Sequence, residues 1–454
     1  MKSPTNEQEL QAFLDRHPGI DAVQVFLTDP GGVTRGKLVR RHELARLYAS
    51  GRQVAGSILG LDVTGMDVDA TGLVWDTGDA DMVCRPVAGT LTPVTWLPVP
   101  SAQLMLTMFE LDGTPAPADP RHALVRSIGR LQGLGYSPVL ACELEFYLLH
   151  PDTLQPAGGG RSSERQKIDA YSLTRLDDLA PLFADVFAAA KAQGLPAETL
   201  MSEYAAGQFE ITLAHRRDAL RAVDEAILFK RLLRGVAARH GLLATFMAKP
   251  FAERAGSGLH LHLSLEDHGG DTGTNLCAAD DPAGSTVLRH MVGGLRRTMA
   301  ESFAIFAPNA NSYRRFQSAS YAPVSSTWGV NNRTVSLRIP AGPPESRHVE
   351  HRVSGADANL YLAAATVLAG IEKGLREALD PGPPTEGNGY AQAVAREFPA
   401  TWHEALDRAE QSAFLRDALG AGTLANYIGI KRQECARFSA QVTELDYAWY
   451  ARSV

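Results

Sequence analysis

Apolar residues in the N-terminal quarter of the chain occur in short runs separated by turn-forming residues, a pattern typical of strands. The turn Asp29-Pro-Gly-Gly32 joins two such runs at hairpin distance. The expected strands are 23–27, 33–39 and 104–111, with edge strands in the Pro-, Val- and Thr-rich stretch 85–100. Pro115-Ala-Pro-Ala-Asp-Pro120 then marks a linker, so the sequence predicts a small β-rich domain before it.

The pattern changes after this linker, where apolar residues recur with helical spacing. Helices are expected at 122–134, 176–193, 218–240, 356–378 and 398–419, with more helix after 420. Strands are expected at 139–149, 208–214, 244–248, 259–265 and 334–339. The sequence therefore predicts an α+β fold in two domains, residues 1–112 and residues 113–454.

Charge and composition argue against several classes of protein. The 454 residues include 44 Lys and Arg against 51 Asp and Glu, a net charge of −7, which is poorly suited to a nucleic-acid groove. No apolar run approaches the roughly 20 residues that span a bilayer. Residues 1–21 lack the basic and apolar regions of a secretory signal. The four cysteines are too scattered for a disulfide framework or a zinc knuckle, so we expect a cytoplasmic enzyme.

Common catalytic signatures are missing from the sequence. It has no GxxxxGK[ST] loop for ATP phosphates and no GxGxxG dinucleotide fingerprint. The GxSxG and HExxH motifs of serine hydrolases and zinc proteases are also absent. Any chemistry must therefore rely on a different set of residues.

Paired carboxylates and imidazoles supply one candidate set. Glu143 and Glu145 stand two apart on an expected strand, so both point to the same face, although solvated acids on a half-exposed strand remain an alternative. Glu203 and Glu210 flank a turn-prone segment with Gly207. His260 and His262 share one face of a strand that follows a Gly-rich loop. Taken alone, this HxH pattern also suits structural histidines or a cupin-type oxygenase.

Arginines complete the set in the C-terminal half of the chain. They occur in Asn311-Ser-Tyr-Arg-Arg-Phe316, in Asn331-Asn-Arg-Thr-Val-Ser-Leu-Arg338 and at Arg352, close to Glu350. Guanidinium groups bind carboxylate and phosphate with two hydrogen bonds. Glutamates with histidine hold hard divalent cations such as Mg²⁺ or Mn²⁺. Together these residues indicate metal-assisted phosphoryl transfer from ATP to a carboxylate.

These motifs and their order resemble the glutamine synthetase family. Residues 249–264 match the family's ATP-region signature in full, and Glu143-Leu-Glu-Phe146, Gly207-Gln-Phe-Glu210 and Asn311-Ser-Tyr-Arg-Arg315 follow in family order. The resemblance covers nearly the whole chain. It implies a β-grasp N-terminal domain and a catalytic domain with a curved antiparallel sheet and helices. It also implies a homo-oligomer with active sites between neighbours in a six-membered ring, and residues 445–454 resemble the tail that joins two rings into a dodecamer.

The resemblance further implies a role for individual residues. A first Mg²⁺ or Mn²⁺ would be held by Glu145, Glu203 and Glu210, and a second by Glu143, His260 and Glu350. Glutamate would be bound by Gly256, His260, Arg315 and Arg352. The nucleotide site would be lined by Glu198, His262, Ser264 and Arg333. The expected catalytic residues are Arg315, Arg333, Arg338 and Tyr321, with Arg333 and Arg338 stabilising the transferring phosphate.

Two positions depart from the ammonia-using members of the family. Ala55 replaces the aspartate that binds and deprotonates ammonium, and Tyr321 replaces the glutamate of a flap. The expected amine site is therefore Ala55, Ser57 and Tyr321, with space for carbon instead of negative charge. Other stretches look most like the γ-glutamylputrescine and γ-glutamylpolyamine synthetases of that family. Asp62 and Asp67 could contact a second ammonium group, or be ordinary loop acids.

Three functions follow as hypotheses. The first is an ATP-dependent ligase that joins the γ-carboxylate of glutamate to an organic amine such as a polyamine. The second is a glutamine synthetase that uses ammonia, and the third is a ring-forming protein without activity. The occupied metal positions favour an enzyme over the third hypothesis. The identity of the amine does not follow from the sequence.

Overall fold

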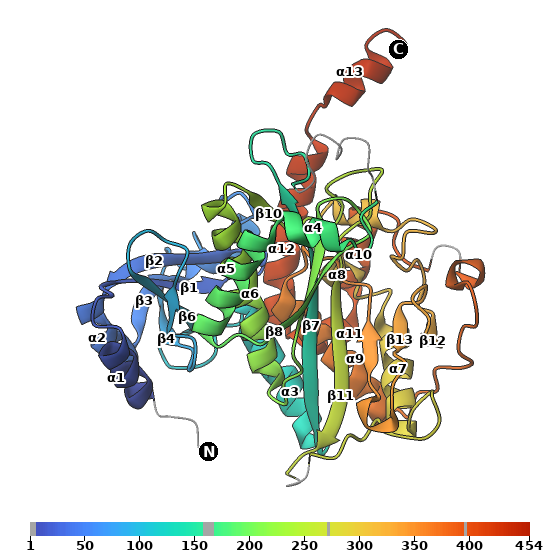
Figure 1. The fold of residues 1–454 in the computed structure, drawn as a ribbon, viewed down its shortest axis with the longest axis horizontal. Helices are drawn as coiled ribbons and strands as arrows, with labels where there is room; N and C mark the ends of the chain where they lie inside the picture. The colour runs from blue at the N-terminus through green and yellow to red at the C-terminus, as the bar shows by residue number, and fades with distance from the viewer. Residues whose placement is uncertain (1–5, 158–167, 270–272, 395–396) are drawn as a thin grey trace.

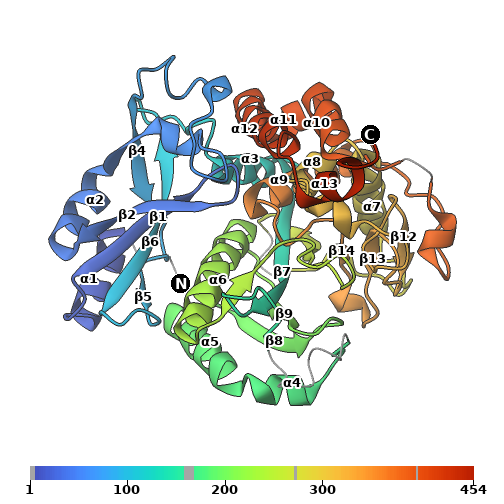
Figure 2. The same ribbon diagram turned by 90° about the horizontal axis from the view of Figure 1, so that it is seen from above.

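The computed structural model describes residues 6–157, 168–269, 273–394 and 397–454. The chain forms two sheets that lie side by side, with most helices grouped around the second (Figures 1 and 2). Two hydrophobic cores accompany them: a smaller one between Leu10 and Ala118 in the chain, and a larger one around the second sheet. Of the helices in this described part, none is both long and apolar enough to cross a membrane.

The first sheet has the strand order β2-β1-β6-β4-β3, with β5 beside β6. Its strands are β1 (Ala22–Thr28), β2 (Thr34–Arg40), β3 (Arg52–Ala55), β4 (Asp81–Pro86), β5 (Thr92–Val94) and β6 (Ser101–Phe109). The expected hairpin is confirmed: Thr28 pairs with Thr34, and Gly32 takes the left-handed φ of 82° that the turn requires. β1 and β6 run parallel, so this sheet is mixed. Helices α1 (Asn6–Arg16) and α2 (Leu44–Ser50) had not been expected.

The second sheet has the order β12-β13-β14-β11-β7-β9-β8, with β10 beside β7. Its strands are β7 (Tyr136–Leu149), β8 (Ala197–Ser202), β9 (Gln208–Leu213), β10 (Leu243–Thr245), β11 (Leu259–Asp267), β12 (Trp328–Val330), β13 (Leu337–Ile339) and β14 (Val349–His351). Its neighbours are antiparallel, as expected, except that β12 and β13 are parallel. β10 and β13 are shorter than predicted.

One face of β7 and β11 is core and the other is polar. Leu144 and Phe146 are fully buried in the larger core, where α6 packs against β7. Because side chains alternate along a strand, Glu143 and Glu145 lie on the opposite face. The helices that follow the first sheet in the chain are α3 (Pro120–Gly133), α4 (Leu173–Asp178), α5 (Ala180–Gln193), α6 (Ala219–Arg239), α7 (Thr286–Thr298), α8 (Phe303–Phe306), α9 (Leu360–Arg376), α10 (Trp402–Gln411), α11 (Ala413–Leu419), α12 (Ala421–Ser439) and α13 (Glu444–Tyr450).

Two predicted helices are each divided into two. The helix expected at 176–193 breaks at Leu179, and α5 begins at Ala180 with Pro181 in its first turn. The helix expected at 398–419 breaks at Ser412, whose hydroxyl accepts the Leu415 N–H at 2.9 Å and caps α11. The helix expected at 356–378 begins only at Leu360, because the Asn359 side chain caps α9.

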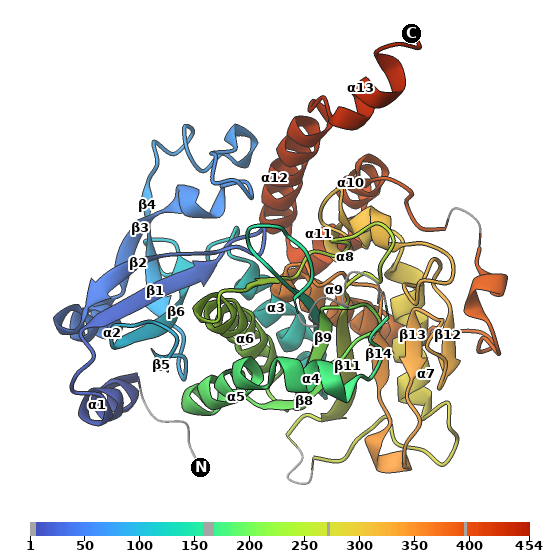
Figure 3. The same cartoon turned by 45° about the horizontal axis from the view of Figure 1, so that its top comes forward.

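The C-terminal helix α13 projects away from the body of the molecule (Figures 1 and 3). It is reached through the long helix α12, which packs against α10 and α11. Large hydrophobic side chains in this part of the chain are exposed, namely Phe438, Val442, Leu445, Tyr447, Trp449, Tyr450 and Val454. These side chains give the C-terminal end of the chain an exposed apolar surface.

Candidate active site

A row of charged residues crosses five strands of the second sheet. Strand pairing places Glu145 opposite Glu210, Glu143 opposite His260, His262 opposite Glu350, and Glu350 opposite Arg338. Cross-strand partners share a face of a sheet, so all seven side chains lie on one face, called here the site face. This confirms that Glu143 and Glu145 point the same way, as do His260 and His262.

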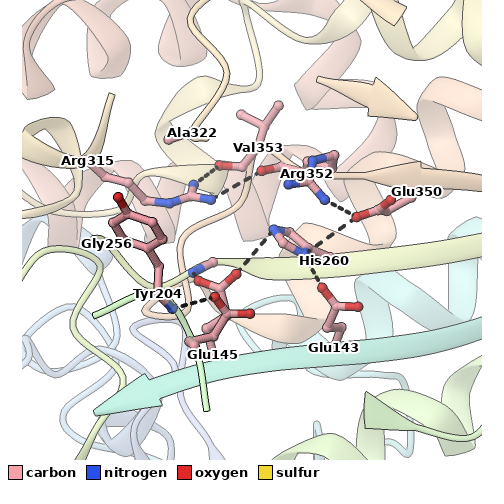
Figure 4. Close-up of polar contacts among 12 residues, drawn as sticks. Glu143, Glu145, Tyr204, Gly256, His260, Arg315, Ala322, Glu350, Arg352 and Val353 are labelled. Atoms are coloured by element: carbon pink, nitrogen blue, oxygen red, sulfur yellow. Dashed lines mark hydrogen bonds and ion pairs between the residues drawn. The ribbon is translucent and has the colours of Figure 1, made fainter. Parts of the chain in front are cut away.

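His260 is the centre of the site face (Figure 4). Its Nδ1 forms a very short contact with Glu143 and lies 3.7 Å from a Glu350 oxygen, while its Nε2 lies 3.8 Å from Glu145. His262 Nε2 lies 3.3 Å from the other Glu143 oxygen. Burial alone would raise the pKa of Glu143, but His260 and His262 lower it well below its usual value.

The carboxylates of Glu203 and Glu210 have raised pKa values, whereas that of Glu143 is lowered. Burial, together with Glu143, Glu145 and Glu203, raises the pKa of Glu210 to about 12. Burial and the nearby Glu145 also raise the pKa of Glu203. These carboxylates repel one another, so their charged forms need a bound cation. Neighbouring N–H groups fix their positions: Gly258 N donates to Glu145 at 2.6 Å, and Tyr204 N donates to Glu203 at 3.0 Å.

Two groups of side chains can each hold a metal ion. The ligand atoms of Glu143, Glu145, Glu210 and His260 all lie within 4.8 Å of one another, as do those of Glu143, His262 and Glu350. Carboxylates with one or two imidazoles suit Mg²⁺ and Mn²⁺. Glu203 lies outside both groups but lines the cavity beside them. His262 joins the second group, where the sequence had placed it only at the nucleotide site.

Arginines surround Glu350 at the other end of the site face. Arg338 Nη1 donates to Glu350 at 2.8 Å, and Arg352 forms a very short ion pair with the same carboxylate. Burial would raise the pKa of Glu350, but Arg352, His262 and His260 lower it to about 2. Arg315 is buried and donates to the carbonyls of Val353 (2.7 Å) and Arg352 (3.3 Å).

Some guanidinium hydrogens at this end have no protein acceptor. Among the described residues, the buried Nε atoms of Arg338 and Arg352 make no hydrogen bond. A buried donor without a partner is costly, and native sites keep such groups where a ligand completes the bond. The arrangement therefore fits an anion bound beside the acids, with positive charge already in place.

A cavity of about 630 Å³ opens over the acidic end of the site face. The expected site residues that line it are Glu143, Glu145, Glu203, Glu210, Gly256, His260, Arg315, Tyr321, Arg333 and Arg352. The sequence analysis missed Tyr171, Tyr204 and Lys249, which also line it. Lys249 could have been noticed, because it begins the motif 249–264. Tyr171 and Tyr204 gave no separate signal in the sequence.

Other expected residues lie outside the cavity lining. Glu350 contacts the lining residue Arg352, and Arg338 contacts Glu350. His262 contacts the lining residue Glu143. Ser264 is buried two residues further along β11. Glu198 is exposed in an irregular part of the edge strand β8. The roles given to these residues stay predictions.

His215 and His348, which the sequence analysis did not select, complete a cluster with His262. The ring centroids of His262 and His348 are 5.2 Å apart, and those of His215 and His348 are 5.4 Å apart. Burial, with His262 next in effect, lowers the pKa of His348 to about 4 and also lowers that of His215. Both are therefore neutral at pH 7, and they could be recognised only once β11 and β14 were paired.

The expected amine-site residues do not meet within one chain: Tyr321 lines the cavity, but Ala55 and Ser57 do not. Ala55 ends β3 and Ser57 lies in the 3₁₀ helix Gly56–Leu59, and neither lines the cavity of this chain. Asp62 is not available to a second ammonium group: it is fully buried, accepts N–H groups of Thr64 and Met66, and pairs with Arg437. The prediction that Asp62 contacts a second ammonium group is therefore wrong, because its carboxylate accepts hydrogen bonds from backbone N–H groups of its own loop. Asp67 is exposed, and its role stays a prediction.

Known proteins resemble the chain along nearly its whole length. The family model "Glutamine synthetase, catalytic domain" matches residues 117–450. γ-Glutamylputrescine synthetase of Escherichia coli K12 is 38% identical, with 98% of this chain and 95% of that protein covered. Glutamate–isopropylamine ligase of a Pseudomonas species is 32% identical, with 97% of each covered. A solved structure of GmaS with ADP has a TM-score of 0.85 at 29% identity and covers 97% of this chain and 99% of its own.

Proposed function

The chain belongs to the glutamine synthetase family, and from this we propose that it is an ATP-dependent ligase that joins the γ-carboxylate of L-glutamate to an organic amine. In the first step the γ-carboxylate attacks the γ-phosphorus of ATP, which releases ADP and gives γ-glutamyl phosphate. In the second step the amine nitrogen attacks the acyl carbon and loses a proton, and phosphate leaves. The product is a γ-glutamyl amide.

The observation that carries this proposal is the joining of two charged halves on the site face. The acids of β7 and β9 meet the arginines around β13 and β14 next to one cavity. Arg338 and Arg352 hold positive charge at this end of the site face, where it would stabilise the negative charge that develops during phosphoryl transfer. The first half binds cations and the second half binds anions, as a reaction between ATP and a carboxylate requires.

Divalent cations would be held by the acids and imidazoles of the site face. By the family resemblance, Glu145, Glu203 and Glu210 would hold the first, and Glu143, His260 and Glu350 the second. In the structure His260 groups with Glu145 and Glu210, and His262 groups with Glu143 and Glu350. The bound ions would neutralise phosphate charge and bridge ATP to the protein. Mg²⁺ and Mn²⁺ both fit this ligand set.

The remaining residues would position the substrates. Arg315, Arg352, Gly256 and His260 would hold glutamate, because they meet at one wall of the cavity. Arg333 and Arg338 would stabilise the transferring phosphate, and the nucleotide would lie against His262, Ser264, Arg333 and Glu198. Arg315, Arg333, Arg338 and Tyr321 are the catalytic residues of this proposal.

An organic amine is favoured over ammonia by charge. A primary amine has a pKa near 10, so it arrives as a cation and must lose a proton before it attacks. Tyr321 lines the cavity and is 58% exposed, so it offers a ring and no negative charge. Ala55 would approach this cavity from a neighbouring subunit and likewise brings no carboxylate. Ammonium therefore loses its electrostatic partners, while a carbon chain gains apolar surface.

An amine panel tests this function. ADP release and amide formation would be measured with glutamate, ATP and either ammonium, putrescine, spermidine, ethanolamine or short alkylamines. We expect kcat/KM for at least one organic amine to exceed that for ammonium by tenfold or more, about 1.4 kcal/mol. Faster use of ammonium than of every amine would instead support a glutamine synthetase. Inert protein with bound metal would support the ring-forming protein without activity.

We also infer a homo-oligomer made of six-membered rings, two of them stacked as a dodecamer. The exposed apolar side chains around α13 support contact between rings, because the tail leaves them without cover in a single chain. The four cysteines are unpaired and buried, which is consistent with a reducing cytoplasm. Partners beyond small-molecule substrates and further copies of this chain are not expected.

A further inference from the structure

One wall of the cavity is a strained segment, residues 317–322, called here the flap. All six of its residues line the cavity. Ala319 and Tyr321 have φ values of 60° and 58°, a left-handed conformation that residues with a side chain rarely adopt. Such strain persists only where surrounding contacts impose it. The contacts that hold the flap therefore decide whether Tyr321 faces the cavity.

Bonds within the flap account for part of this conformation. Ser320 Oγ donates to the carbonyl of Gln317 at 2.6 Å, and Ala322 N donates weakly to Ser320 Oγ at 3.4 Å. Ser320 Oγ also lies within hydrogen-bonding distance of the Arg315 carbonyl, at 3.3 Å, which ties the turn to the residues just before the flap. These bonds are all local, so a contact from a distant part of the chain is needed to fix the flap relative to the rest of the cavity.

Tyr390 supplies such a contact from a distant part of the chain. It lies in the 3₁₀ helix Gly389–Gln392, and its hydroxyl donates to the Ala322 carbonyl at 3.1 Å. Burial raises the pKa of Tyr390, so the hydroxyl keeps its proton and remains a donor at neutral pH. The residue is half-buried and does not itself line the cavity.

The segment that carries Tyr390 also holds the loop of Arg333, on another wall of the cavity. Asn332 Nδ2 donates to the Gly387 carbonyl at 2.8 Å, and Gly389 N donates to Thr334 Oγ1 at 2.8 Å. Arg333 thus has an anchored residue on each side. The same short segment is bonded to the flap and to the loop of an expected phosphate-binding arginine.

We propose that Tyr390 is a positioning residue that holds the flap over the cavity, from a segment that also anchors the Arg333 loop. This deepens the proposed function, on which its catalytic readout rests. With the flap in place, the amine attacks the acyl carbon of γ-glutamyl phosphate and phosphate leaves. With the flap released, water reaches the same carbon, so glutamate and phosphate form and ATP is spent without amide.

Tyr390→Phe tests this, because it keeps the ring and removes only the hydroxyl. One hydrogen bond is worth roughly 2- to 10-fold in an equilibrium. We expect the ratio of ADP released without amide to amide formed to rise by about that factor, with the KM for the amine raised and the KM for ATP unchanged. Tyr136→Phe, at the far end of β7 from the site, is the matched control and should leave the ratio unchanged.

Hydrogen exchange gives a second readout that does not need turnover. The amides of the flap should exchange roughly 2- to 10-fold faster in Tyr390→Phe, while those of β7 stay unchanged. Unchanged flap exchange together with an unchanged ADP-to-amide ratio would overturn the proposal. If wild-type protein forms no amide from any amine but flap exchange still rises in the variant, the tether stands and the proposed function fails.

Discussion

Glu145 and Glu210 face each other directly across the neighbouring strands β7 and β9. Neither has a cation opposite it in the strand register, and Glu203 and Glu143 add further negative charge close by. The sheet therefore holds a pair of acids at a distance that is unfavourable unless a proton or a metal ion is bound. This relationship makes the site testable without any substrate.

The first prediction concerns the pH dependence of stability in metal-free protein. The folded-state pKa of Glu210 is raised from 4.5 to about 12, so its stabilising effect is complete below the lower value and is lost as the pH rises toward the higher one. Between these two pH values the folded protein binds one proton more than the unfolded chain. The free energy of unfolding therefore falls by about 1.4 kcal/mol for each unit by which the pH rises. Glu210→Gln should flatten this slope by about that amount.

The measurement is chemical denaturation in the presence of a chelator at several pH values. Glu198→Gln is the control, because Glu198 is exposed on β8 and should leave the slope unchanged. A slope in Glu210→Gln equal to that of wild type would show that Glu210 is ionised in the metal-free protein.

The second prediction separates acids from thiols as metal ligands. Glu203→Ala should abolish ATP-dependent turnover while circular dichroism shows a folded protein, because Glu203 lies among the acids that need a cation. All four cysteines are buried, and burial raises the pKa of each thiol, so they are poor ligands. A folded variant with every cysteine replaced by alanine should remain active and bind Mg²⁺ or Mn²⁺, and its complete inactivity would contradict this assignment.

The third prediction concerns Ala55. Ala55→Asp should raise kcat/KM for ammonium and lower it for organic amines, because it returns a negative charge and removes space. We expect each change to reach about tenfold, or 1.4 kcal/mol. Ala88→Asp adds the same charge at an exposed site of the same sheet region and should change neither value. If kcat/KM for ammonium and for organic amines changed equally in Ala55→Asp and Ala88→Asp, the change would come from the net charge of the protein and not from the amine site.

The fourth prediction concerns the C-terminal tail. Ending the chain after residue 441 removes α13 and most of the exposed apolar residues around it. We expect light scattering to show a dodecamer for the full chain and single rings for the shortened one. Activity should persist in the rings, since the tail contributes nothing to the cavity lining. An active monomer of the full chain would contradict the ring.

The spacing of residues within one strand predicted much of the site. Glu143 and Glu145, like His260 and His262, are two apart, and the alternation of side chains alone places each pair on one face. The Asp29–Gly32 turn and its hairpin were equally local, because turn residues determine the backbone there. Prediction succeeded where neighbours in sequence determine the structure.

Prediction failed where the deciding contact is distant. Nothing near His348 in the sequence shows that it contacts His262, since that contact exists only after β11 and β14 pair. Asp62 looked like a free loop acid, but Arg437 on α12 and its own loop amides bury it. The divided helices show the same limit on a smaller scale, because Leu179 and Ser412 each end one helix and precede the next within a continuous apolar pattern.

The order of strands in the second sheet has a consequence for how the protein folds. The first group of possible cation ligands needs β7, β9 and β11 to be paired, and the second needs β7, β11 and β14. A fragment that ends before β11 therefore contains neither ligand set. Long-range pairings of this kind form slowly. Binding of Mn²⁺ during refolding should therefore occur later than the recovery of the helix signal, and it would report when β11 has paired with β7.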